Sequence, residues 1–78
     1  MASAAKAYIL IECKVGATTE VVAGLKHLKG IKSVKTVTGP YDVIAVLELE
    51  TLHDIGDLVT QNIRLVTGII RTVTCVAL

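Results

Sequence analysis

Aromatic residues are scarce in this chain, which has two tyrosines and neither phenylalanine nor tryptophan. Protein sheets that bind single-stranded RNA stack the bases on aromatic side chains, and this chain cannot supply such a platform. Basic residues are not in excess either: eight lysines and arginines face seven acidic residues, for a net charge of +1. A surface without a basic excess gives no electrostatic attraction for phosphates. We therefore expect no direct binding to nucleic acid.

Long apolar runs are also missing, and none exceeds five residues. A membrane-spanning helix needs about 20 consecutive apolar residues, so we expect no membrane partner. The first six residues lack the basic and apolar regions of a signal peptide, which predicts a cytoplasmic location. Cys13 and Cys75 lie in apolar strand contexts without CxxC spacing. Free thiols in a reducing compartment are the expected state.

Residues with catalytic or metal-binding chemistry are few and dispersed. His27 and His53 stand alone, the only serines are Ser3 and Ser33, and no Cys, His or carboxylate group has metal-ligand spacing. No nucleophile with a paired base can be assembled from these residues. The sequence predicts a non-enzyme with no metal and no cofactor.

Apolar residues, by contrast, are abundant. They make up 53% of the 78 residues, and the mean hydropathy is +0.68. A domain of this size buries only roughly 60% of the surface that its unfolded chain exposes. The surplus of apolar side chains predicts that one face of the domain packs against a second copy.

Hydrophobic periodicity predicts four strands and two helices in the order β-α-β-β-α-β. Thr18 is expected to cap the first helix, and Thr51, paired with Asp54, the second. The expected strands cover residues 7–15, 33–38, 42–50 and 69–77, and Ile9, Ile11 and Cys13 are expected on one face of the first. The expected buried positions of the second helix are Leu52, Ile55, Leu58, Val59 and Ile63. The fold class is therefore α+β: a ferredoxin-like sandwich with an antiparallel sheet of order 4-1-3-2 and both helices on one face. Residues 1–5 are assigned to an N-terminal tail and residues 6–78 to one domain.

Two polar motifs interrupt the apolar strands. The first is the turn Thr38-Gly39-Pro40-Tyr41-Asp42, and the second is the pair Thr72 and Thr74 in the last strand. Each has a plain structural interpretation: Asp42 caps the turn, and threonine favours strands. Residues two apart in a strand share a face, so Thr72 and Thr74 can also present both hydroxyls to one ligand.

The combination of these two motifs resembles the ligand-binding domain of the Lrp/AsnC (feast/famine) transcriptional regulators, the RAM domain. The resemblance runs from about Lys6 to Leu78 and rests on residues 37–42, on the second helix and on residues 68–74, which include Arg71-Thr72-x-Thr74. The full-length regulators carry a helix-turn-helix domain before this one. We therefore expect a stand-alone effector module, without direct DNA binding, that acts in transcriptional regulation or amino acid metabolism.

The resemblance implies a homodimer that assembles into a ring of eight or so chains, an amino acid effector held between dimers, and possible partnership with full-length regulators. It assigns the carboxylate of the effector to the turn and the ammonium to Asp42. It places the following residues at the ligand: Gly39, Tyr41, Asp42, Thr72 and Thr74, with Gly56 and Thr60 at the pocket wall.

Three alternatives stay open at this point. The chain can be an assembly module without an effector, or a small ferredoxin-like dimeric enzyme, although Asp42 is its only acid/base candidate. An ACT-type regulatory domain has a similar fold and ligand class, and Gly16 matches its usual glycine.

Overall fold

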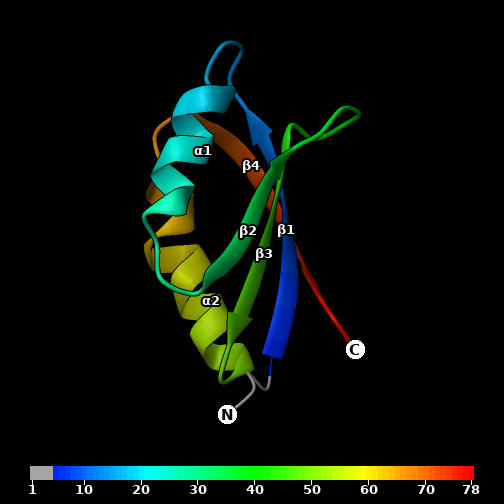
Figure 1. Cartoon of the computed structure of the whole chain (residues 1–78), viewed down its shortest axis with the longest axis vertical. Coiled ribbons are helices and arrows are strands. Elements are labelled where there is room, and N and C mark those ends of the chain that lie inside the picture. The colour runs from blue at the N-terminus through cyan, green and yellow to red at the C-terminus, as the bar shows by residue number, and fades with distance from the viewer. Residues whose placement is uncertain (1–4) are drawn as a thin grey trace.

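Four strands and two α-helices make up the computed structural model, which describes residues 5–78 (Figure 1). A 3-10 turn, η1, follows the second helix. The elements are β1 (Ala5–Cys13), α1 (Thr18–Lys26), β2 (Ile31–Thr36), β3 (Val43–Leu49), α2 (Leu52–Gln61), η1 (Ile63–Leu65) and β4 (Ile69–Val76). The strands form one antiparallel sheet of order β2-β3-β1-β4, and both helices lie on the same side of it (Figure 1). This is the predicted ferredoxin-like fold.

The core lies between the helices and one face of the sheet. Alternate residues of the two central strands point into it, because side chains two apart in a strand share a face. Twelve apolar residues are buried: Ala7, Ile9, Ile11, Cys13, Val21, Leu25, Val43, Ala45, Leu47, Ile55, Val59 and Ile63. The strand faces therefore agree with the sequence pattern, in which Ile9, Ile11 and Cys13 share one side.

The two helix starts differ in how they are capped. The Thr51 hydroxyl accepts a hydrogen bond from the Asp54 N–H at 3.0 Å, as predicted for α2. Thr18, however, is the first residue of α1, and Ala17 occupies the N-cap position without a side-chain hydrogen bond. The prediction for Thr18 was wrong by one residue, because the tight turn at Gly16 fixes where the helix begins.

Other details also differ from the sequence-based expectations. β1 begins at Ala5, which pairs with Leu49, although residue 5 was assigned to the tail; residues 1–4 lie outside the described part. β2 runs from Ile31 to Thr36 rather than over 33–38. Leu52, expected in the buried stripe of α2, is 57% exposed, because it occupies the first helical position beyond the edge of the core.

Gly68 directs the chain from η1 into β4. Its φ of +101° lies in the left-handed region, and an added Cβ would approach Ala17 Cβ at 2.9 Å and Val21 Cγ2 at 3.0 Å. The Gly68 carbonyl also accepts a hydrogen bond from the Lys14 N–H at 2.8 Å. Only glycine fits here without strain. This glycine thus sets the position at which β4 starts beside β1.

No element within residues 5–78 covers the sheet face opposite the helices (Figure 1). Strand pairing places Tyr8 opposite Val46, and Leu10 opposite both Ile44 and Val73, on this face. Tyr8 is exposed and the other four are half-buried. We name this apolar surface the open face. Neither α1 nor α2, the α-helices of residues 5–78, is long and apolar enough to cross a membrane.

Candidate ligand pocket at the edge strand

β4 forms one edge of the sheet, and the helix layer covers it incompletely. On the helix side, the main contact of β4 is with the short turn η1, whereas α2 packs against β1 and β3. A three-residue turn cannot cover an eight-residue strand. The uncovered part of β4 is the place where the fold leaves room for a ligand.

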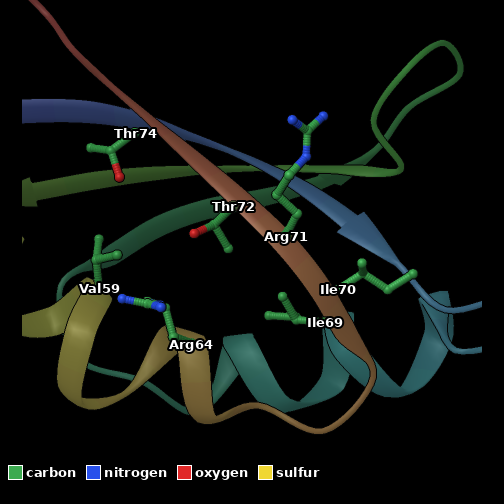
Figure 2. Close-up of a pocket in the computed structure, with 7 residues that line it drawn as sticks. All are labelled: Val59, Arg64, Ile69, Ile70, Arg71, Thr72 and Thr74. Atoms are coloured by element: carbon green, nitrogen blue, oxygen red, sulfur yellow. The ribbon is translucent and has the colours of Figure 1, made fainter.

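A cavity of about 440 Å³ lies at this position. Its volume is within the range of roughly 300–1,000 Å³ found for small-molecule sites. It is lined by Val59, Arg64, Ile69, Ile70, Arg71, Thr72 and Thr74 (Figure 2). We call this cavity the β4 pocket.

Thr72 and Thr74 point into the β4 pocket from the strand. Thr72 pairs with Ile11 and Thr74 with Ile9, and both isoleucines are fully buried on the helix side. Opposite residues of an antiparallel pair share a face, so both threonines lie on that side as well. Figure 2 shows the two hydroxyls directed toward the side of β4 where Val59 and Arg64 lie. Of the proposed ligand residues, these two meet in one cavity.

Arg64 approaches the pocket from the opposite wall. It is the middle residue of η1, and its side chain extends toward Val59 and the hydroxyl side of β4 (Figure 2). Its guanidinium makes no ion pair with an acidic group of residues 5–78. Sequence reasoning missed this residue, because only the chain turn after α2 brings position 64 opposite positions 72 and 74.

Arg71 lies next to Thr72 in sequence but points to the other side of the strand (Figure 2). Its Nε lies 3.5 Å from Glu12 Oε1, and its Nη2 donates a hydrogen bond to the Tyr41 hydroxyl at 3.1 Å. The guanidinium also lies 5.3 Å from the centre of the Tyr41 ring. Tyr41 therefore connects the turn after β2 to β4, next to the pocket rather than inside it.

Asp42 has a structural contact of its own. Its Oδ2 accepts a hydrogen bond from the Cys13 N–H at 2.8 Å, and its own N–H donates to the Ile11 carbonyl at 2.8 Å. These bonds tie the start of β3 to the end of β1. Burial and the nearby Asp42 carboxylate raise the pKa of the Cys13 thiol above its ordinary value of 9.0, and a hydrogen bond with Thr18 partly opposes this. Asp42 does not line the β4 pocket of its own chain.

Gly39, Gly56 and Thr60 lie outside the pocket lining as well. Gly39 has a φ of +122° and open space around its Cα, consistent with an exposed turn. The Thr60 hydroxyl donates to the Gly56 carbonyl at 2.9 Å, within α2. This bond satisfies the Thr60 hydroxyl locally, on the exposed side of the helix.

The fold and this pocket together define a class: a small ferredoxin-like domain with a polar ligand cavity beside its edge strand. The model of the Lrp/AsnC ligand binding domain family matches residues 6–78, and the chain belongs to that family. The family assignment makes the chain a regulatory, effector-binding type of domain.

Solved structures agree with this assignment. The protein TTHA0845 from Thermus thermophilus is 31% identical with a TM-score of 0.90, over 95% of this chain and 92% of that one. The transcriptional regulator NMB0573 from Neisseria meningitidis, solved in complex with L-Met, is 14% identical with a TM-score of 0.86, over 96% of this chain and 50% of that one. Escherichia coli AsnC is 19% identical with a TM-score of 0.89, over 95% and 50%. The last two likenesses show the shared fold.

A curated relative has a different context. Homocitrate synthase from Sulfurisphaera tokodaii is 30% identical over 74 residues, which are 94% of this chain. The chain spans 16% of the length of that relative. A module similar to this one therefore occurs as a small part of a larger protein.

Proposed function

We propose that this chain is a regulatory module, not an enzyme, that binds a small amino acid or a close chemical relative in the β4 pocket. The observation that carries the proposal is the convergence of Thr72, Thr74 and Arg64 on one cavity, in a domain of the Lrp/AsnC ligand-binding family. The Neisseria regulator of the same fold was solved with L-Met, which supports an amino acid as the ligand class. Hydroxyls and a guanidinium are groups that bind a carboxylate.

The turn residues Gly39, Tyr41 and Asp42 enter the proposal as contributions from a second copy of the chain. Within one chain they border the pocket only through the contact between Tyr41 and Arg71. The family resemblance implies effector sites between dimers, where the turn of one copy can approach the pocket of another. Gly56 and Thr60 keep only a peripheral place in this proposal, on the exposed side of α2.

Assembly belongs to the same proposal. We propose that two copies pack through the open face and that dimers associate further, into a ring of eight or so chains. Apolar side chains left half-exposed on a sheet face favour such packing. We also propose that the module associates with full-length regulators. A cytoplasmic location, which suits free Cys13 and Cys75, belongs to the same proposal.

A thermal-shift screen of the twenty amino acids, followed by calorimetric titration, tests the binding proposal. We expect at least one amino acid to raise the Tm, because a ligand that binds only the folded state stabilises it. Thr72→Val and Thr74→Val keep the side-chain shape and remove the hydroxyl. Each should weaken binding by about three- to tenfold, the effect of one lost hydrogen bond. Thr67→Val, at an exposed threonine outside the pocket lining, is the control.

Two other outcomes would redirect the proposal. A protein that forms a ring but binds none of the amino acids or related acids would instead be an assembly module. The relative within homocitrate synthase favours a second candidate, in which the module regulates an enzyme rather than transcription. That candidate would be supported if a biosynthetic enzyme co-purified with the chain only in the presence of the effector, and if the chain had no effect on the activity of a full-length regulator.

A further inference from the structure

The charges that line the β4 pocket are all positive. Two arginines and no acidic residue line it, and the remaining lining residues are uncharged. Arg71 is neutralised by Glu12 at 3.5 Å, whereas Arg64 makes no ion pair with the acidic residues of the described chain, 5–78. The pocket thus carries one uncompensated cation.

A zwitterionic amino acid fits this arrangement with only one of its two charges. Its carboxylate can accept hydrogen bonds from Arg64, Thr72 and Thr74, but no residue of this chain's lining offers a carboxylate to its ammonium. Asp42 of a second copy, the acidic residue that the proposed function brings to the pocket, already accepts a hydrogen bond from the Cys13 N–H of its own chain. Placing an ammonium near a guanidinium without an acceptor is unfavourable. An acid with net negative charge avoids this conflict. In an acidic amino acid, the second carboxylate offsets the positive charge of the ammonium. In a 2-oxo acid, an oxo group replaces the ammonium and carries no positive charge.

We infer that the β4 pocket selects small carboxylic acids of net negative charge, such as acidic amino acids and 2-oxo acids, and that Arg64 binds the carboxylate. This inference rests on the proposed function, and it adds the charge class of the ligand and the residue that determines it. The planar guanidinium suits this role, because it offers two parallel N–H groups to the two oxygens of a carboxylate. Thr72 and Thr74 then donate from the facing strand to the same carboxylate or to a neighbouring oxygen.

Matched ligand pairs test the inference by calorimetric titration of the full chain. L-Glutamate and L-glutamine differ by one charge and have nearly the same shape, and 2-oxoglutarate replaces the ammonium by an oxo group. We expect 2-oxoglutarate and L-glutamate to bind more tightly than L-glutamine by about fivefold or more, with affinities that fall as salt is added. Inorganic phosphate distinguishes carboxylate recognition from general anion binding, and we expect it to bind at least about tenfold more weakly than 2-oxoglutarate.

Variants of Arg64 identify the group responsible. Arg64→Gln should weaken the binding of 2-oxoglutarate by about five- to tenfold, and Arg64→Lys should restore part of it, because charge returns without the paired donors. Lys29→Gln removes the same charge at an exposed position outside the pocket and should leave the affinity unchanged. Arg64 is exposed, so its variants should fold, and their Tm values without ligand should equal that of the wild type.

Three results would overturn the inference. In the first, a neutral amino acid binds with an affinity that Arg64→Gln does not change, and the acids do not bind. This result would reject the charge class of the ligand and leave the proposed function intact. Equal binding of phosphate and 2-oxoglutarate would reduce the pocket to an unspecific anion site. Equal losses in Arg64→Gln and Lys29→Gln would show that only the net charge of the protein matters.

Discussion

Replacing Asp42 separates a structural role from a ligand-binding one. In Asp42→Ala, the Cys13 N–H loses the acceptor that now lies 2.8 Å away, in a partly buried position. An unsatisfied backbone donor costs about 1–3 kcal/mol, and the neighbouring bond between Asp42 N–H and the Ile11 carbonyl remains in place. For a domain of this size, a loss of 1 kcal/mol lowers the Tm by roughly 4–8 °C. We therefore expect Asp42→Ala to lower the Tm by roughly 4–24 °C.

Asp42→Asn gives the intermediate case. The amide oxygen can still accept from the Cys13 N–H, but the charge that strengthens the bond is lost. Charge-assisted hydrogen bonds contribute about twice as much as neutral ones, so we expect a loss of about 1 kcal/mol or less. The order of stability should be wild type, then Asp42→Asn, then Asp42→Ala.

Thermal and urea unfolding measure these differences, with Asp57→Ala as the control. Asp57 pairs with His53 on the surface of α2, where the His53 side chain is largely exposed and that of Asp57 about half exposed. Exposed pairs contribute about 0–1 kcal/mol, so this variant should unfold close to the wild type. If Asp42→Ala were as stable as Asp57→Ala, the contact with Cys13 would contribute nothing, and Asp42 would be free for a ligand role alone.

The remaining predictions concern the helix, the thiol and the open face. Gly56→Ala should raise the unfolding free energy by about 0.5–1 kcal/mol, because Gly56 lies in α2 with nothing within 4 Å of an added Cβ. The pKa of the Cys13 thiol is higher in the folded protein than the ordinary value of 9.0 expected for the unfolded chain. This difference stabilises the folded protein below pH 9.0, and the stabilisation is lost as the pH rises from about 9.0 through the folded-state pKa. In Cys13→Ala, the unfolding free energy should therefore depend less on pH in that range. In a Cys75→Ser background, Asp42→Asn should lower the pKa of Cys13, measured by thiolate absorbance, because it removes a nearby negative charge. Val46→Lys places an unpaired charge on the open face and should dissociate the proposed dimer to monomers or unfold the chain, as measured by light scattering. An unchanged mass would contradict the proposed interface.

The sequence predicted those parts of the fold that depend on local patterns. The alternation of Ile9, Ile11 and Cys13 and the capping pair Thr51 and Asp54 are properties of short segments, and both are confirmed. Thr18 failed as a cap, because the turn at Gly16, two residues earlier and with a φ of +81°, leaves Ala17 at the N-cap and Thr18 as the first residue of the helix. Such a shift depends on turn geometry and is not encoded in residue preference alone.

The site was predicted less completely, for a topological reason. Thr72 and Thr74 were identifiable as a pair from their spacing, but their direction depends on pairing with Ile11 and Ile9 across the sheet. Arg64 enters the pocket from a 3-10 turn that no pattern in the sequence marked.

A crystal structure of the chain with the strongest ligand from the binding screen tests the central claim most directly. We expect the ligand between β4 and η1, with its carboxylate on the Arg64 guanidinium and on the hydroxyls of Thr72 and Thr74. A ligand bound on the open face, or held at the turn near Asp42 with no contact to the two threonines, would contradict the assignment of the β4 pocket as the effector site.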